Sequence, residues 1–239
     1  MWKSGLSGTA MLGALALSIA TANAQGIPGM RGHDHTGITV PDMAQAVDFF
    51  TNVIGCQKAM SFGPFSDDKG TFMQDLLNVN PRAVIEEITL IRCGHGSNLE
   101  LFKYTSPDQV DATPKNSDIG GYHIAFYVDD IQAARDYLEK QGVKTFLGPL
   151  NVKEGPAGGQ SIFYFLAPWG LQLEAISYPQ GMLYEKESPV ILWSPKDPAS
   201  RLMSGDPPRR GSPSRPPRRP CAPSSPSRST RGPSSGRRG

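Results

Sequence analysis

The sequence has few cysteines and no apolar segment long enough to span a membrane comfortably. Only three of its 239 residues are cysteines, and one of them, Cys221, lies close to the C-terminus. Cys56 and Cys93 therefore either form one disulfide in an oxidising compartment or remain as free buried thiols. The longest apolar segment, residues 11–20, is too short for a membrane span, and we interpret it as part of an export signal.

Residues 1–24 contain the parts of an export signal in the expected order. Lys3 supplies a positive charge, residues 11–20 are apolar, and Ala22-Asn23-Ala24 forms a small-x-small cleavage site. A buried N-terminal helix is the alternative interpretation. We expect a signal peptide that is cleaved before Gln25. The mature protein would then be periplasmic or secreted and not attached to a membrane.

The C-terminal segment, residues 195–239, has almost no aliphatic residues and is rich in Pro, Ser, Gly and Arg. Such a segment cannot bury enough apolar surface to offset its ordering entropy, so we expect a disordered tail. It carries 11 Lys/Arg and 2 Asp/Glu, a net of +9; the whole chain is +2, so residues 1–194 carry −7. A basic tail can contact nucleic acid or anionic lipid. Because an exported protein rarely meets nucleic acid, we expect no such partner.

The remaining core, residues 25–194, contains an internal repeat with an offset of 88 residues. Five positions are identical in the two copies: His35/His123, Val40/Val128, Asp42/Asp130, Ala46/Ala134 and Asp48/Asp136. In each copy a β-branched and aromatic run predicts a strand, and an Asp follows it where a helix N-cap belongs. Apolar residues at helical spacing then predict a helix, which ends at Gly55 or Gly142.

Each copy continues with three further predicted strands. They cover residues 57–62, 84–92 and 98–104 in the first copy and residues 144–146, 160–166 and 171–177 in the second. Residues 71–77 predict a loop or short helix, and residues 167–170 predict a hairpin turn. The order β-α-β-β-β occurs twice, so we predict an α+β fold of two similar modules, residues 25–115 and 116–194.

One histidine and one glutamate occupy equivalent places in the two modules. His35 and His123 open the first strand of each module, and Glu100 and Glu174 lie within the last strand, among apolar residues. Taken singly, such residues more often face solvent or a hydrogen-bond partner. A buried carboxylate without a partner is costly, and one divalent metal ion would satisfy all four groups. Imidazole and carboxylate ligands suit Zn, Ni, Co, Mn or Fe(II).

Two other histidines are weaker candidates for this metal site. His33 lies close to His35, but only His35 matches His123 in the repeat. His95 has no counterpart in the second copy and lies among glycines, so we interpret it as a loop residue.

Four motifs together resemble the vicinal oxygen chelate superfamily, which includes glyoxalase I, methylmalonyl-CoA epimerase, extradiol dioxygenases and bleomycin or fosfomycin resistance proteins. The motifs are DHTGITVPD at residues 34–42, NLELF at 98–102, GYHIAF at 121–126 and YFLAPWGLQLE at 164–174. The resemblance extends over residues 33–179. It implies eight strands in a half-open cup around one metal ion, with a ligand set similar to that of glyoxalase I and the epimerase.

The resemblance implies a lyase or isomerase that transfers a proton next to a carbonyl of a small chelating substrate. Glu174 or Glu100 would be the base, and the resemblance favours Glu174. An extradiol-type Fe(II) dioxygenase is one alternative, although that class generally uses two His and one Glu. A non-catalytic small-molecule binder is the other. The predicted export argues against glutathione and CoA substrates. Related proteins build the cup within one chain or across a homodimer, and both arrangements stay open.

Overall fold

The computed structural model describes residues 26–198 of the chain. The predicted signal peptide at residues 1–24 lies outside the described residues, as does most of the predicted tail, residues 199–239. Within residues 26–198, no helix has both the length and the apolar composition needed to cross a membrane.

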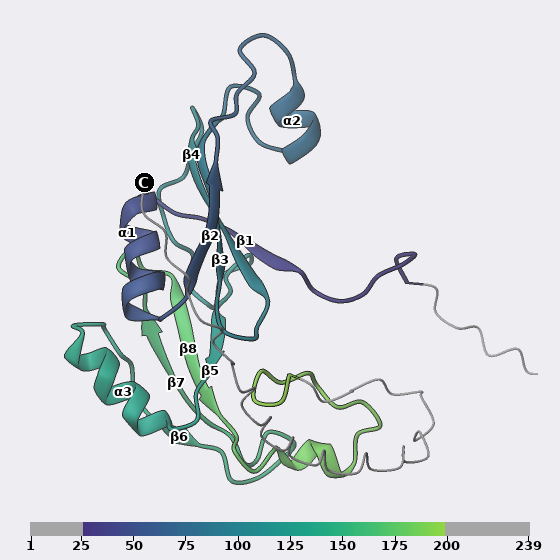
Figure 1. Cartoon of the computed structure of the whole chain (residues 1–239), viewed down its shortest axis with the longest axis vertical. Coiled ribbons are helices and arrows are strands. Elements are labelled where there is room, and N and C mark those ends of the chain that lie inside the picture. Colours follow the sequence, from purple (N-terminus) through teal and green to yellow (C-terminus); the bar gives the residue numbers. More distant parts are fainter. Residues whose placement is uncertain (1–25, 199–239) are drawn as a thin grey trace, which may run out of the picture.

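The described chain consists of two modules with the same order of strands, shown in Figure 1. The first module contains β1 (His35–Thr39), α1 (Met43–Asp48), η1 (Phe49–Val53), β2 (Gln57–Phe62), α2 (Phe72–Leu77), β3 (Val84–Arg92) and β4 (Asn98–Thr105). The second module contains β5 (Ile124–Tyr127), α3 (Ile131–Lys140), β6 (Leu150–Asn151), β7 (Ser161–Leu166) and β8 (Gln172–Ser177), followed by η2 (Leu183–Lys186). The repeated β-α-β-β-β order is confirmed, and α2 is an additional element in the first module.

Both helices that follow the first strand begin and end as the sequence predicts. The Asp42 carboxylate accepts a hydrogen bond from the backbone N–H of Gln45 at 2.7 Å, and Asp130 caps α3 in the same way. Gly55 and Gly142 lie after the two helices with φ angles of +88° and +77°. A residue with a Cβ rarely adopts such angles, so glycine allows the chain to turn toward the next strand.

The strands form two separate four-stranded sheets with the same topology. The order is β1-β4-β3-β2 in the first sheet and β5-β8-β7-β6 in the second. In each sheet the first strand is parallel to the last, and the other neighbours are antiparallel. This confirms the predicted α+β fold of two βαβββ modules. Because the two sheets are not hydrogen-bonded to each other, the eight strands do not close into one continuous cup.

The predicted strand at residues 144–146 is confirmed in part: this segment pairs with β7, but the regular strand at this edge of the sheet is β6 (Leu150–Asn151). The predicted segment forms only an isolated bridge, between Thr145 and Phe165. Pro149, just before β6, has no N–H group to donate to a ladder. Pairing with β7 is therefore interrupted here: the Phe146 N–H donates to the Tyr164 carbonyl before the proline, and the β6 ladder follows it.

The main hydrophobic core lies on the helix side of both sheets and is shared by the two modules. Leu99 and Leu101 of β4 are buried in it together with Leu173 and Ala175 of β8. Burial of each leucine contributes about 1.5–3 kcal/mol. Side chains alternate along a strand, so the residues between these four lie on the opposite face of each sheet. We call this opposite face the ligand face, because Glu100 and Glu174 lie on it.

Helix α2 belongs to a second, smaller core on the ligand face of the first sheet. Met73 of α2 is fully buried, and its cluster includes Ile88 of β3 and the partly buried Phe102 of β4. Figure 1 shows α2 standing away from the second module, beyond the end of the first sheet. The inserted segment between β2 and β3 therefore extends the first module only.

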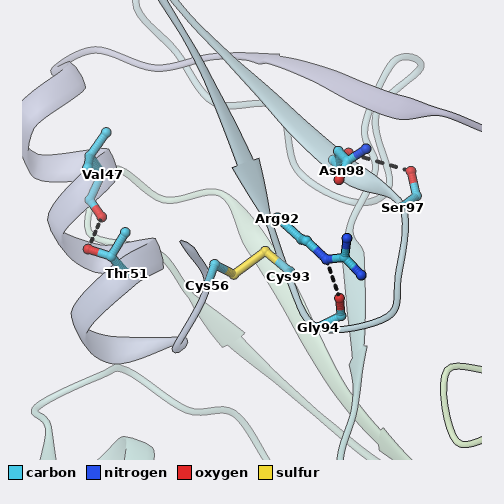
Figure 2. The surroundings of a disulfide bond; sticks show 8 residues. All are labelled: Val47, Thr51, Cys56, Arg92, Cys93, Gly94, Ser97 and Asn98. Atoms are coloured by element: carbon cyan, nitrogen blue, oxygen red, sulfur yellow. Dashed lines mark hydrogen bonds between the residues drawn. A yellow bond between two sulfur atoms is a disulfide. The ribbon is translucent and has the colours of Figure 1, made fainter. Parts of the chain in front are cut away.

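A disulfide joins Cys56 and Cys93, the residues that flank β2 and β3 (Figure 2). The two Cα atoms are 4.4 Å apart. Gln57 and Arg92 pair next to them in the antiparallel ladder, which brings the cysteines opposite each other. Of the two alternatives from the sequence, the structure contains the disulfide.

Residues at the predicted boundary between the core and the tail contact the second module. The Tyr178 hydroxyl lies 2.9 Å from the Ser194 hydroxyl. The Lys196 ammonium donates a hydrogen bond to the carbonyl of Pro179 at 3.1 Å. These contacts hold residues 194–196 beside the end of β8.

Candidate metal centre

The first half of the candidate site lies on neighbouring parallel strands of the first sheet. His35 is the first residue of β1, and Glu100 lies in β4 opposite Gly37. The His35 Nε2 atom is 3.2 Å from the Glu100 Oε2 atom. Strand pairing therefore brings together two residues that are far apart in the sequence.

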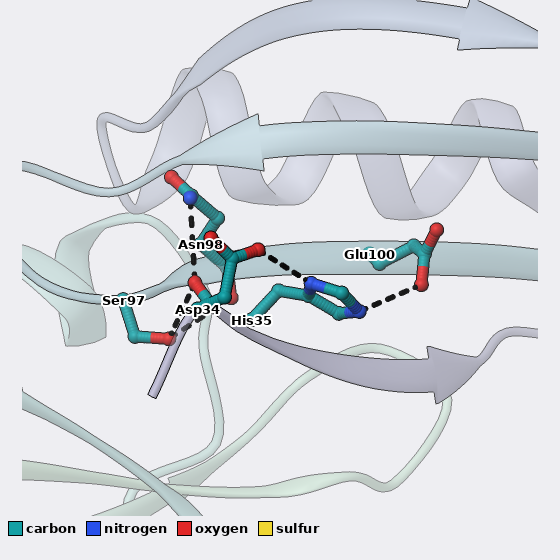
Figure 3. A network of polar contacts seen from close by, with 5 residues as sticks. All are labelled: Asp34, His35, Ser97, Asn98 and Glu100. Carbon is teal, nitrogen blue, oxygen red and sulfur yellow. Dashed lines mark hydrogen bonds and ion pairs between the residues drawn. The ribbon is translucent and has the colours of Figure 1, made fainter. Parts of the chain in front are cut away.

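Asp34 holds the other side of the His35 ring, as Figure 3 shows. The His35 Nδ1 atom is 2.7 Å from the Asp34 Oδ1 atom, and this hydrogen bond is the main cause that raises the pKa of His35. Partial burial of the ring opposes the rise, and the negative charges of Glu100 and Asp34 add to it. The Asp34 carbonyl accepts hydrogen bonds from the backbone N–H of Asn98 and the Ser97 hydroxyl, both at 3.1 Å.

The second half of the site also pairs a histidine with a glutamate at neighbouring parallel strands, in the second sheet. His123 directly precedes β5, and Glu174 lies in β8 opposite Ala125. The His123 Nε2 atom is 2.9 Å from the Glu174 Oε2 atom. The His123 Nδ1 atom lies 3.1 Å from the Asn116 side-chain oxygen, where the first half-site has a carboxylate.

Glu174 is the more buried of the two carboxylates. Its side chain is 8% exposed, compared with 19% for Glu100. Burial raises the pKa of the Glu174 carboxyl, while the charge of His123 and hydrogen bonds from Tyr164 and His123 act in the opposite direction. Burial also raises the pKa of Tyr164, and the negative charge of Glu174 contributes to the same shift.

The structure brings the predicted ligands together in two pairs. His35 lies with Glu100 on one sheet, and His123 lies with Glu174 on the other. Within residues 26–198, no three His, Cys, Asp or Glu side chains are close enough to bind one ion. The four-ligand set therefore stays a prediction. His95 lies in the turn between β3 and β4, as predicted, and His33 precedes β1.

The residues of each pair fit a divalent cation in donor type and in orientation. Two imidazoles and two carboxylates suit the metals expected from the sequence. Metal-bound histidines usually engage their second ring nitrogen with a carboxylate, a carbonyl or water, which orients the ring. Here Asp34 and Asn116 occupy that place, and each Nε2 atom faces its carboxylate.

Three residues of these half-sites were not among the predicted site residues. Asp34 directly precedes His35, and Tyr164 lies ten residues before Glu174 in a motif that carries the resemblance. The predicted hairpin turn at residues 167–170 places Tyr164 opposite Glu174, which is the signal that could have found it. Asn116 lies in the loop before β5 and has no such signal.

A family model described as the Glyoxalase/Bleomycin resistance protein/Dioxygenase superfamily matches residues 34–164. This range is more than half of the chain and includes His35, Glu100 and His123. The chain belongs to this superfamily. The predicted resemblance to the vicinal oxygen chelate superfamily is thereby confirmed.

A relative within the superfamily is an epimerase. The 2-epi-5-epi-valiolone epimerase of an Actinomyces species is 42% identical over 173 residues, which are 72% of this chain and 93% of the relative. A glyoxalase family protein from Bacillus cereus is 18% identical with a TM-score of 0.48, covering 64% of this chain and 98% of that one. A fosfomycin resistance protein from Listeria monocytogenes is 14% identical with a TM-score of 0.43, covering 66% and 98%.

Proposed function

We propose that this protein is a divalent-metal-dependent epimerase that inverts a carbon next to a ketone by moving a proton. The observation that carries the proposal is the 42% identity to an epimerase over 93% of that relative's length. The two histidine–carboxylate pairs supply the acid–base groups that such a reaction needs.

The proposed substrate is a small ketone that carries a second oxygen beside its carbonyl. The relative's name ends in the suffix of a ketone and specifies two stereocentres by position. A carbonyl group acidifies the hydrogens of the carbon beside it, so proton transfer can invert a stereocentre at that carbon. We therefore take 2-epi-5-epi-valiolone as the first compound to test.

In the proposed reaction, a carboxylate oxygen of the chain takes the proton from the carbon next to the carbonyl. The electron pair of the broken C–H bond forms a double bond to the carbonyl carbon, and the carbonyl oxygen gains the negative charge. A divalent cation held by His35, Glu100, His123 and Glu174 would supply positive charge beside that oxygen. When a proton returns to the opposite face of the carbon, the ketone forms again with its stereocentre inverted.

Two carboxylates in equivalent places suit this reaction better than one. Epimerisation removes a proton from one face of a carbon and delivers a proton to the other face. Glu100 and Glu174 come from corresponding strands of the two modules, so each can serve one face of a substrate bound where a first and a second half-site meet. A positioned acid or base of this kind typically contributes 10²- to 10⁴-fold to a rate.

We further propose that a second copy of this chain brings the two half-sites together. Support comes from the separation of the pairs on two sheets and from exposed apolar side chains beside the first half-site. Met60 is 53% exposed and Phe62 is 40% exposed, and both lie on the ligand face of the first sheet. A dimer that places this face against the second module of the partner would cover them and complete the ligand set.

The Cys56–Cys93 disulfide supports the proposal that the protein is exported. Disulfides persist in the periplasm and outside the cell and are rare in the cytosol. Export also fits a substrate that is neither a glutathione nor a CoA conjugate.

The proposed function is tested by deuterium exchange. The full chain is incubated in D₂O with 2-epi-5-epi-valiolone and, in turn, Zn, Ni, Co, Mn or Fe(II), and proton NMR follows the hydrogen beside the ketone. We expect loss of this signal and the appearance of an epimer, both abolished by a chelator and restored by metal. Absence of exchange with every metal would contradict the proposal. Oxygen consumption with a catechol would instead support the dioxygenase alternative.

A further inference from the structure

The turn between β3 and β4, residues 93–97, connects the disulfide of the first module to the first half-site. Cys93 is the first residue of the turn, and Ser97 is the last, directly before β4. Between them lie Gly94, with a φ angle of +59°, and Gly96. Glycine has more conformational freedom than any other residue. A cross-link at the start of this turn therefore restricts a segment that its glycines would otherwise leave free to change conformation.

The disulfide holds the start of the turn against the main core. Cys56 is 5% exposed and belongs to that core, and Cys93 packs against it. Next to Cys93, the Arg92 Nε atom donates a hydrogen bond to the carbonyl of Gly94 at 3.1 Å. Figure 2 shows this bond beside the disulfide, with Ser97 at the other end of the turn. The first half of the turn is thus fixed by one covalent bond and one hydrogen bond.

The other end of the turn holds Asp34. The Asp34 carbonyl accepts hydrogen bonds from the Ser97 hydroxyl and the backbone N–H of Asn98, both at 3.1 Å, and from the Asn98 side-chain amide at 3.3 Å (Figure 3). The Asp34 side chain is 83% exposed, and residues 26–34 before β1 are exposed throughout. Contacts with the end of the turn, and not burial, therefore fix Asp34. Its carboxylate in turn binds the His35 ring at 2.7 Å.

We propose that the Cys56–Cys93 disulfide is a positioning element of the metal centre, which holds the His35 imidazole for the cation through the β3–β4 turn and Asp34. Because it concerns metal binding, this role rests on the metal dependence of the proposed function. The contacts run from Cys93 along the turn to Ser97, from Ser97 to the Asp34 carbonyl, and from the Asp34 carboxylate to the ring. A histidine that is oriented in advance binds a metal more tightly, because binding does not have to order the ring.

The second module holds the corresponding turn in a different way. This β7–β8 turn, residues 167–170, contains Trp169, whose ring packs edge-on against two phenylalanine rings of η1, each at 5.9 Å between centroids. The Trp169 carbonyl accepts a hydrogen bond from the Thr113 hydroxyl at 2.9 Å. Thr113 lies in the same loop as Asn116, which contacts His123. Aromatic packing fixes this turn, so loss of the disulfide should affect the first half-site alone.

The test is a double-mutant cycle on metal affinity in the full chain. Zn, Ni, Co, Mn and Fe(II) are titrated into the wild type against a chelator, and the metal that binds most tightly is used for all variants. We expect C56A/C93A to lose about 10-fold in affinity, the lower end of the range for groups that orient a metal-bound histidine. In the D34A background the same change should cost less than about twofold, because the contact is already lost. In the N116A background the full loss should remain.

S97A keeps the disulfide and removes one donor to the Asp34 carbonyl, so it tests the same path if C56A/C93A does not fold. Loss of one neutral hydrogen bond should lower the affinity about 2- to 10-fold. S106A, which removes a hydroxyl just beyond the other end of β4, is the matched control and should change the affinity by less than about twofold. Alanine variants are used in place of chemical reduction, because free thiolates would themselves bind the metal. Circular dichroism identifies a temperature at which the variants compared are folded.

Each other outcome overturns a defined claim. Equal affinities of folded C56A/C93A and the wild type, or an equal loss with and without D34A, contradict a positioning role for the disulfide. An S97A variant that binds metal as tightly as the wild type contradicts the path through Asp34. The expected pattern of affinities without deuterium exchange overturns the proposed epimerase and leaves the positioning role intact. A wild type that binds none of the five metals overturns both.

Discussion

The two half-sites share the arrangement of their ligands and differ in the groups around them. The imidazole–carboxylate distance is 3.2 Å in the first module and 2.9 Å in the second. The Nδ1 atom of the imidazole contacts a carboxylate, Asp34, in the first module and an amide, Asn116, in the second. The residue opposite the glutamate on the neighbouring antiparallel strand is Leu90 in the first module and Tyr164 in the second. The repeated strands thus preserve the ligand pair, while its neighbours have diverged.

The difference indicates how a symmetric scaffold can perform an asymmetric reaction. Inverting a stereocentre needs one group that takes a proton and another that gives one back. Strand pairing places both carboxylates, and the side chains on neighbouring strands then distinguish them. Changes to these side chains should therefore affect the two halves unequally.

The largest expected effect follows from replacing either carboxylate with an amide. E174Q and E100Q keep an oxygen donor but cannot accept a proton, so we expect epimerisation to slow by about 10²- to 10⁴-fold in each. Turnover of 2-epi-5-epi-valiolone measures this. E154Q, which alters an exposed carboxylate in the loop after β6, is the matched control. Full activity in both site variants would rule out the proton-transfer mechanism.

A second prediction concerns the Cys56–Cys93 disulfide. Among residues 26–198, the first module has this disulfide and the second module has none. Replacing both Cys56 and Cys93 with alanine should lower the free energy of unfolding by about 2–4 kcal/mol, because the disulfide restricts the unfolded chain. Denaturant unfolding of the oxidised wild type and the double variant measures the difference. Reduced wild-type protein should resemble the variant. An unchanged unfolding midpoint would contradict a structural role for this bond.

The contrast between Asp34 and Asn116 predicts unequal effects on metal affinity. Loss of a residue that orients a metal-bound histidine typically costs 10- to 100-fold in affinity. We expect D34A to lose about this factor and D34N to lose less, because the amide oxygen still accepts the hydrogen bond. N116D should bind metal more tightly than the wild type, because it adds a negative charge behind His123. Chelator competition gives each affinity, and identical values for all variants would show that these residues do not orient the ligands.

The smallest expected effect is a pH dependence in the metal-free protein. The hydrogen bond to Asp34 raises the pKa of His35 above its usual 6.5, so the folded state binds this proton more tightly than the unfolded state. The resulting stabilisation is fully present below the unfolded pKa and is lost as the pH rises through the folded pKa. D34N should therefore unfold more easily than the wild type at about pH 5 and equally at about pH 9. If D34N were still less stable than the wild type at about pH 9, protonation of His35 could not be the source of the difference in stability.

Much of the fold could be predicted because its local signals agree with one another. Asp42 and Asp130 cap helices, Gly55 and Gly142 end them, and the β-branched runs between them pair as strands. The segment at residues 144–146 pairs with β7 as predicted, but strand propensity does not reveal that the regular edge strand lies at residues 150–151. That depends on Pro149 and on the position of β7.

The candidate site could be predicted only in part from the sequence. The repeat identified both His–Glu pairs, because equivalent residues of a repeat occupy equivalent places in a sheet. It could not predict how far apart the modules hold the pairs, since that depends on packing between them. The place of Tyr164 opposite Glu174 depends on strand register, and the contact of Asn116 depends on a loop without a repeat counterpart.

The central claim is that the two half-sites of different chains combine to form one active site. H35A and H123A variants are each expected to be inactive, because each lacks one half-site. When the two are co-expressed, half of the dimers are mixed, and each mixed dimer holds one intact site of two. The mixture should therefore recover about a quarter of the wild-type epimerisation rate.

Co-expression of H35A with E100Q is the matched control for this measurement. Both substitutions alter the first module, so no mixed dimer contains an intact site, and we expect no recovery. Recovery of about a quarter of the activity by the first pair alone would support a site shared between two copies. A mixture of H35A and H123A that stays as inactive as its separate components would contradict the account.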